Sequence, residues 1–214
     1  VVCVDGLALV YKRSTAGGGT WTSQTLTQTS SNLPFQDAKI AVDGSTVAIG
    51  LQRADIYIDV FCSADGGVTF PYSSSITESG VEDLQICVSG SYVYLVWRDP
   101  SSQNILATVS DDGGVNWNNG GYGGLTVPNT DEMDNFILGC ELSDAWIVYA
   151  QAGDPAGKEP SDGLWTTYTL DGGESWAPSL QRFEGVVGDV TTCQDDGVVY
   201  AGFASNDQAF AVRS

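Results

Sequence analysis

Histidine is absent from this chain of 214 residues, and Lys and Arg together number only 8 against 27 acidic residues. Without histidine the chain lacks the commonest transition-metal ligand and the usual general base. The formal net charge of −19 speaks against nucleic acid as a partner, because binding a phosphate backbone requires a basic surface. Such an acidic surface favours solubility and suits divalent cations, and we expect most of it to be simply solvated.

Long apolar runs are also missing, so the sequence predicts no membrane span, which would need about 20 apolar residues. No signal peptide precedes Val1, and we expect a mature product or a piece of a longer chain. No two cysteines form a CxxC pair, which argues against a zinc or thioredoxin-type site. Cys87, Cys140 and Cys193 fall at the same phase of a repeat, and Cys3 could join them. They either fill the core or form disulfides between neighbouring repeats, with at least one thiol left over.

What the chain does contain indicates an all-β fold. Apolar residues make up 42% of the sequence, with 6 Trp and 26 Gly. This composition fits a folded, turn-rich protein rather than a disordered one.

Four segments of eight residues repeat one pattern and end in an aromatic residue. They occupy residues 14–21, 63–70, 110–117 and 169–176, and their closing aromatic residues stand 49, 47 and 59 positions apart. A period of this length with turn residues at a fixed place indicates a repeat fold. In three copies a carboxylate that can accept amide hydrogens precedes two glycines that can adopt positive φ. These are Asp65, Gly66 and Gly67, then Asp112, Gly113 and Gly114, then Asp171, Gly172 and Gly173.

The segments resemble the Asp-box, Ser-x-Asp-Gly-Gly-x-Thr-Trp, also called the bacterial neuraminidase repeat, which marks sialidase-like β-propellers. Ala16 replaces the Asp in the first copy, which is degenerate. The resemblance implies an all-β propeller of about five blades in one domain, with repeats at roughly 1–34, 35–80, 81–131, 132–185 and 186–214. It also implies that the Asp-boxes are structural and lie on the face opposite the ligand.

The third repeat predicts four strands, at residues 83–89, 92–97, 105–109 and 115–117. The first repeat lacks one strand, and the last stops after its third. Residues 1–4 could close the ring by pairing with the last repeat, or the ring is open and a neighbouring chain completes it. We therefore expect a homo-oligomer.

The resemblance places the start of each inner strand and the end of the second strand on the ligand face. A ring of carboxylates at these places could hold Ca²⁺ through oxygen ligands, or hold a general acid for glycoside cleavage. Strand-end capping and Arg–Asp pairing are the plainer interpretation. The predicted ligand-binding residues are Asp37, Arg53, Asp83, Arg98, Asp99, Asp134 and Asp189. The predicted calcium ligands are Asp37, Asp83, Asp134 and Asp189.

Sialidases bind the substrate carboxylate with three arginines and use a Tyr–Glu nucleophile pair. None of the five arginines here lies in a Phe/Tyr-Arg-Ile-Pro element, and spacing assigns no Tyr–Glu pair. We therefore predict a non-catalytic, extracellular or cell-surface propeller for recognition, adhesion or assembly, with a glycan or protein partner and no cofactor other than calcium. The alternative is a divergent sialidase-like glycoside hydrolase, which would use Asp37, Asp83, Asp189, Arg53 and Arg98.

Overall fold

A computed structural model describes most of the chain: residues 1–5, 7–15, 17–28, 35–53, 57–77, 80–102, 104–118, 125–127, 133–151, 163–185, 187, 190–195, 198–205 and 208–213. These residues form eighteen β-strands and no helix. Within these stretches there is accordingly no helical segment that could cross a membrane.

The strands form five antiparallel sheets in which each strand pairs with its neighbour in sequence. Sheet 1 contains β1 (Val2–Asp5), β2 (Ala8–Arg13) and β3 (Thr22–Gln28). Sheet 2 contains β4 (Phe35–Asp43), β5 (Thr46–Arg53), β6 (Tyr57–Ser63) and β7 (Tyr72–Thr77). Sheet 3 contains β8 (Glu82–Ser89), β9 (Tyr92–Arg98), β10 (Ile105–Ser110) and β11 (Leu125–Thr126). Sheet 4 contains β12 (Met133–Glu141), β13 (Asp144–Gln151), β14 (Gly163–Thr169) and β15 (Leu180–Glu184). Sheet 5 contains β16 (Val190–Asp195), β17 (Val198–Ser205) and β18 (Gln208–Arg213).

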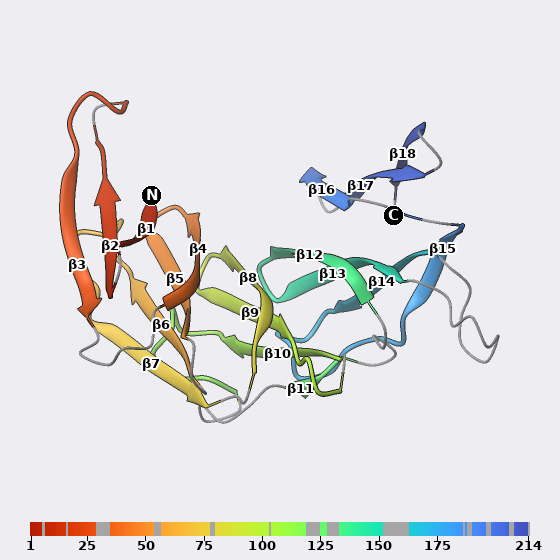
Figure 1. Cartoon of the computed structure of the whole chain (residues 1–214), viewed down its shortest axis with the longest axis horizontal. Helices are drawn as coiled ribbons and strands as arrows, with labels where there is room; N and C mark the ends of the chain where they lie inside the picture. The colour runs from red at the N-terminus through yellow and green to blue at the C-terminus, as the bar shows by residue number, and fades with distance from the viewer. Residues whose placement is uncertain are drawn as a thin grey trace.

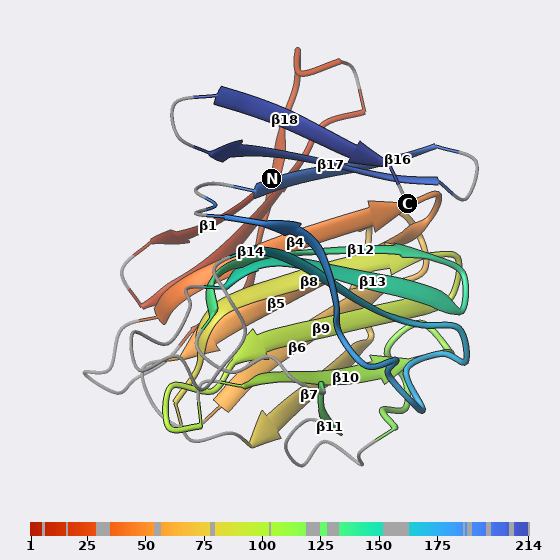
Figure 2. The same ribbon diagram turned by 90° about the vertical axis from the view of Figure 1, so that its right-hand side faces the viewer.

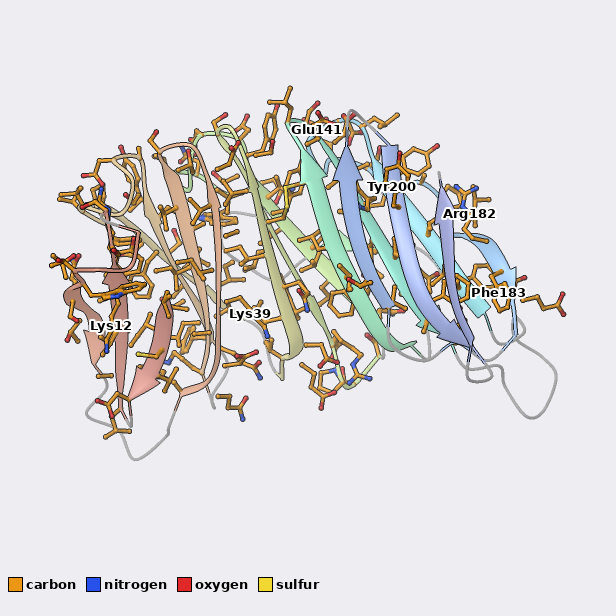
Figure 3. The ribbon with its side chains drawn as sticks, turned by 90° about the horizontal axis from the view of Figure 1, so that it is seen from above. Lys12, Lys39, Glu141, Arg182, Phe183 and Tyr200 are labelled. Carbon is orange, nitrogen blue, oxygen red and sulfur yellow. A yellow bond between two sulfur atoms is a disulfide. The ribbon has the colours of Figure 1, made fainter. Side chains whose placement is uncertain are left out.

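The five sheets follow one another face to face in the order of the sequence (Figure 1). Their first strands β4, β8, β12 and β16 run side by side, each in contact with the next (Figure 3). The expected all-β propeller architecture is confirmed.

The core lies between consecutive sheets, and the central strands of sheets 2 and 3 are buried on both faces. In β9, Val93 and Leu95 pack in the apolar cluster between sheets 2 and 3, whereas Tyr94 and Val96 pack in the cluster between sheets 3 and 4. All four side chains are fully buried. A strand buried on both faces reads as a continuous apolar run, which is why this segment was recognisable in the sequence.

Sheet 1 lacks the counterpart of an inner strand. In sheets 2 to 4 the Asp-box joins the third strand to the fourth, and the degenerate first box joins β2 to β3. β1 therefore corresponds to a second strand, and Cys3, which lies opposite Val10, does not share the position of Cys87. Among the described residues β1 pairs with β2, and no ladder joins sheet 1 to sheet 5. Closure of the ring by residues 1–4 is not what this structure shows.

A disulfide joins Cys87 of β8 to Cys140 of β12, with Cα atoms 6.1 Å apart. Cys87 lies two residues before the end of its strand, but Cys140 lies only one residue before the end of its own. Side chains alternate along a strand, so this displacement turns Cys140 to the opposite face of sheet 4, where it meets Cys87. The prediction that Cys87 and Cys140 occupy the same position in the repeat is wrong. The interpretation as a disulfide between neighbouring repeats is confirmed for this pair.

The other described cysteines are free thiols in different surroundings. Cys62 is 1% exposed, and burial raises the pKa of its thiol to about 12, so it is a core residue that stays protonated. Cys3 is exposed. The side chain of Cys193 lies outside the described residues.

The predicted fourth strand of the third repeat is wrong. Residues 115–117 form no strand, and the fourth strand of sheet 3 is the short β11. The reason is local: the amides of Val115 and Asn116 donate to Asp112 Oδ1 at 3.0 and 2.8 Å, so they are unavailable to a β-ladder.

Candidate functional site

The first strands of sheets 2, 3 and 4 share an irregularity near their starts. A one-residue β-bulge lies between Phe35 and Asp37 in β4, between Glu82 and Gln85 in β8, and between Met133 and Asn135 in β12. Bulges redirect side chains and are common beside active sites. We call this edge of the sheets the bulge face; it holds the starts of β4, β8 and β12 and the ends of β5, β9 and β13.

The Asp-boxes lie at the other edge, which we call the box face. The first-glycine amides of the boxes, Gly66, Gly113 and Gly172, donate to backbone carbonyls in the β4–β5, β8–β9 and β12–β13 turns at 2.8, 2.8 and 2.9 Å. Those turns are at the far end of the inner strands from the bulges. The boxes therefore lie at the edge opposite the bulges, and their backbone hydrogen bonds join them to the turns of their own sheets.

Arg53 ends β5 on the bulge face, where its charge is compensated within sheet 2. Its Nη1 lies 3.5 Å from Asp59 Oδ2, and its guanidinium lies 5.2 Å from the centroid of the Tyr57 ring. Asp59 is 8% exposed and also accepts a hydrogen bond from the Ser75 hydroxyl at 2.5 Å. Such a carboxylate needs a partner, since a buried charge without one is costly.

Asp37 does not join this group. Its Oδ2 lies 2.9 Å from Lys39 Nζ, and its Oδ1 accepts the Ala38 amide at 2.8 Å. Gln52, 7% exposed, lies opposite Asp37 in the ladder and donates to the carbonyl of Val81. That hydrogen bond ties sheet 2 to the start of sheet 3 at the bulge face.

Arg98 ends β9 at the place that Arg53 has in sheet 2, and it meets two carboxylates. Its Nη2 lies 2.8 Å from Glu82 Oε2 and 2.8 Å from Asp83 Oδ2. The arginine side chain is 20% exposed, whereas the Glu82 and Asp83 side chains are about half exposed, at 49% and 48%. The positive φ of Asp83, 54°, belongs to the bulge and directs its carboxylate onto Arg98. Asp tolerates this conformation better than most residues.

Asp99 organises the loop that follows β9. Its Oδ1 accepts the Ser101 amide and hydroxyl at 2.8 and 2.7 Å, and its Oδ2 accepts the Ser102 hydroxyl at 2.7 Å. Burial acts to raise the pKa of Asp99, but the hydrogen bonds from Ser102 and Ser101 outweigh it and lower the pKa. Asp99 is thus an ionised turn residue, with both oxygens already engaged.

The predicted calcium ring stays a prediction. Asp37 and Asp83 each pair with their own basic residue, and the described residues bring no three acidic or cysteine side chains together as a metal site would need. The side chain of Asp134, which is the bulged residue of β12, and the whole of Asp189 lie outside the described residues.

The Asp-box carboxylates are fully committed to their turns. Asp65 accepts the Val68 and Thr69 amides at 2.9 Å each through Oδ1 and the Thr69 hydroxyl at 2.7 Å through Oδ2. The Ser63 hydroxyl donates to Asp65 at 2.7 Å and accepts the Gly67 amide at 2.9 Å. The Thr69 and Ser63 hydrogen bonds hold the pKa of Asp65 well below its usual range. Asp112 and Asp171 repeat this geometry.

Sequence reasoning missed Glu82, Asp59 and Tyr57. A signal for Asp59 was present: it is the single charged residue of strand β6 and stands between Ile58 and Val60. Glu82 and Tyr57 carried no signal of their own, because their positions depend on the bulge in β8 and on the start of β6.

No protein-family model and no curated protein matches this chain. Solved structures do. The endosialidase of phage phi92 is similar over 86% of this chain and 33% of its own, with 17% identity and a TM-score of 0.54. A Hadza microbial sialidase, Hz136, shows 18% identity over 94% of this chain and 43% of its own, with a TM-score of 0.46. The Trypanosoma rangeli sialidase shows 12% identity over 96% of this chain and 38% of its own, with a TM-score of 0.49. The chain thus spans about a third of the endosialidase, on which the fold assignment rests.

Proposed function

We propose that this sialidase-like Asp-box β-propeller is a non-catalytic recognition part of an extracellular or cell-surface protein, and that its bulge face binds a carbohydrate. The observation that carries the proposal is the state of the two arginines on that face. Arg53 is held by Asp59 and Arg98 by Glu82 and Asp83. An arginine that serves a substrate carboxylate has to offer its guanidinium to the ligand, and here carboxylates of the chain occupy both.

The paired groups on the bulge face suit hydroxyl-rich ligands. Glu82 and Asp83 are about half exposed, and each can accept hydrogen bonds from sugar hydroxyls while retaining its contact with Arg98. A half-exposed ion pair tolerates such sharing because water already competes for the same oxygens. A neutral sugar also avoids the repulsion that a molecule of net charge −19 exerts on acidic glycans.

The Cys87–Cys140 disulfide supports the extracellular assignment, because disulfides persist mainly in oxidising compartments.

The test is binding without turnover. Immobilised neutral and sialylated oligosaccharides are presented to the protein, and the same protein is incubated with a fluorogenic sialoside. We expect binding of neutral glycans and no released fluorophore. Glu82→Gln together with Asp83→Asn should weaken binding at least tenfold, whereas Glu174→Gln on the box face should leave it unchanged. If the double variant bound the neutral glycans as tightly as the control variant, the assignment of binding to the bulge face would be refuted.

One observation favours a glycoside hydrolase as the second candidate: the bulge that recurs at the start of three inner strands, since bulges often adjoin active sites. Hydrolysis of the sialoside that disappears in Asp83→Asn would establish this candidate instead.

A further inference from the structure

The second Asp-box meets the sheet before it differently from the third and fourth boxes. In those two, a Cβ on the second glycine would overlap a residue that directly precedes the box of the preceding sheet, Cys62 or Val109. In the second box, a Cβ on Gly67 would overlap Tyr11, which stands three residues before the first box. Strand β2 therefore continues past this contact to Arg13, and the β2–β3 hairpin projects beyond the rest of the molecule (Figures 1 and 2).

A cavity of about 320 Å³ lies between this longer hairpin and the second box, and we call it the hairpin cavity. Its lining comes from β2, β3 and the second box alone. Sheet 1 contributes two pairs of the β2–β3 ladder, Tyr11 with Gln24 and Arg13 with Thr22, whose side chains share one face of the sheet. The box contributes its second glycine and Val68. The hairpin cavity therefore belongs to the box face.

Arg13 brings a positive charge to this cavity. Within the part of the chain that the structure describes, its guanidinium has no ion pair, unlike those of Arg53 and Arg98. It is partly buried, and its Nη2 lies 3.7 Å from the position of a Cβ on Gly66, so it lies against the second box. The neighbouring Asp65 commits both oxygens to hydrogen bonds of the box turn. The N–H donors of Arg13 are therefore available to a ligand.

The Tyr11 hydroxyl is a second donor at the same cavity. The Tyr11 side chain is 6% exposed, and its hydroxyl makes no hydrogen bond among the described residues. Burial raises the pKa of Tyr11, whereas the charge of Arg13 acts to lower it and that of Asp65 to raise it. The phenol therefore stays protonated at neutral pH and can donate its hydrogen. Because an unmade hydrogen bond of a buried group is costly, a ligand that accepts this hydrogen is favoured.

We propose that the hairpin cavity binds a hexuronic acid unit of a carbohydrate, with the sugar carboxylate on Arg13 and Tyr11. The planar guanidinium matches a carboxylate with two parallel hydrogen bonds, and the Tyr11 hydroxyl adds a third. Thr22 and Gln24, both exposed, can bond with the ring hydroxyls, and Val68, 55% exposed, can contact the apolar face of the ring. The volume is at the small end for ligand sites, which suits a single ring.

The net charge of −19 limits this site to isolated carboxylates. Charges on the surface are screened over about 8 Å at physiological ionic strength, so the nearby guanidinium dominates for a single acidic sugar. A run of acidic sugars would extend past Arg13 to the acidic remainder of the surface and would be repelled. One uronic acid unit among neutral sugars is therefore the preferred form of the ligand.

The experiment titrates the ¹⁵N-labelled chain with glucuronate and, separately, with glucose, which has the same ring without the carboxylate. Amide spectra and the Arg13 Nε–H signal report binding. We expect glucuronate to shift the Gly67 and Val68 amides and the Arg13 Nε–H signal, with a dissociation constant of about 1 mM. Glucose should bind at least about tenfold more weakly, because it cannot form the charge-assisted hydrogen bonds.

Substitutions separate the two donors from a general effect of charge. Arg13→Ala should weaken glucuronate binding at least about tenfold, and Tyr11→Phe about threefold. Arg182→Ala changes the net charge equally but removes an exposed arginine of sheet 4, so it should leave the affinity unchanged. The bulge-face double variant Glu82→Gln/Asp83→Asn should still bind glucuronate, which makes this site independent of the carbohydrate site proposed there. Amide spectra of each variant show whether it is folded.

Three outcomes would overturn the proposal. The first is a folded parent whose box and Arg13 signals do not move with glucuronate, or move equally with glucose. The second is an undiminished affinity in folded Arg13→Ala. The third is inorganic sulfate that shifts the same signals at lower concentration than glucuronate does, because the cavity would then be a site for free anions rather than for a sugar.

Discussion

Replacing Gly114 with alanine should destabilise the protein far more than replacing Gly113, although the two are adjacent in one box. Both have positive φ, 93° and 76°, which costs an L-residue about 1–2 kcal/mol. A Cβ on Gly113 meets nothing within 4 Å, whereas one on Gly114 overlaps the Sγ and Cβ atoms of Cys62. Cys62 is 1% exposed and belongs to the apolar cluster between sheets 2 and 3.

The overlap adds the usual cost of overpacking a core, about 1–3 kcal/mol. Gly113→Ala should therefore lower the free energy of unfolding by about 1 kcal/mol, after allowance for the reduced entropy of the unfolded chain. Gly114→Ala should lower it by about 2–4 kcal/mol. For a chain of this size, that corresponds to a fall in Tm of about 3 °C and about 9 °C.

Urea unfolding followed by tryptophan fluorescence measures both values, and an unchanged m-value confirms that the folded state stays compact. Gly18→Ala in the first box is the matched control. Its φ is 90°, but its Cβ would meet only Trp21, at 4.0 Å, so it should cost about as little as Gly113→Ala. Equal losses in Gly113→Ala and Gly114→Ala would refute the inference that the box is wedged against the preceding sheet.

Three further predictions concern other parts of the fold. The double variant Cys87→Ala/Cys140→Ala should lower the free energy of unfolding by about 2–4 kcal/mol, because the disulfide closes a loop of 53 residues. Thermal unfolding measures this loss, and equal Tm values of the parent protein with and without reductant would contradict it. Hydrogen bonds from Ser175 lower the pKa of Asp171 in the folded state to about 2, below the unfolded value of about 3.9. The stabilisation that they give is therefore complete above about pH 4 and is lost as the pH falls through 2. Asp171→Asn should reduce the fall in the free energy of unfolding at acidic pH, as measured by unfolding at a series of pH values. Leu142 has a φ of 51° in the β12–β13 turn, where the corresponding turns of sheets 2 and 3 have Gly44 and Gly90. Leu142→Gly should therefore change the free energy of unfolding by less than about 1 kcal/mol in the same urea assay. Leu142→Val should lower it by about 1–2 kcal/mol, because a β-branched side chain fits this conformation poorly.

The repeat and its turn chemistry could be predicted from the sequence because both are local. Asp65 reaches its hydrogen-bond donors within four residues, so the box can be recognised from eight letters. The strand at Tyr92–Arg98 was equally readable, since burial on both faces leaves a continuous apolar run. The fourth strand was misplaced because the Asp112 carboxylate accepts the amides of Val115 and Asn116, which keeps these residues out of a β-ladder.

The geometry of the candidate site could not be predicted from the sequence, because it depends on the positions of one-residue β-bulges in the inner strands. Asp37 and Asp83 stand at equal distances before Ala41 and Cys87 in sequence. The bulge in β4 precedes Asp37, however, whereas the bulge in β8 includes Asp83. Equal spacing therefore does not give equal positions in the sheet, since one extra residue reverses which side chains face each neighbour.

A shift of one residue also accounts for the disulfide between Cys87 and Cys140. Had Cys140 stood at the exact counterpart of Cys87, both side chains would face the same way around the row of sheets and could not meet. Gly139 occupies that counterpart, and a Cβ there would overlap the Trp146 indole, which already fills the space. The disulfide thus depends on a shift of one residue, whereas an alignment of the repeats places Cys87 and Cys140 at equivalent positions. For this cysteine pair, the departure from the repeat is what brings two residues of neighbouring sheets into contact.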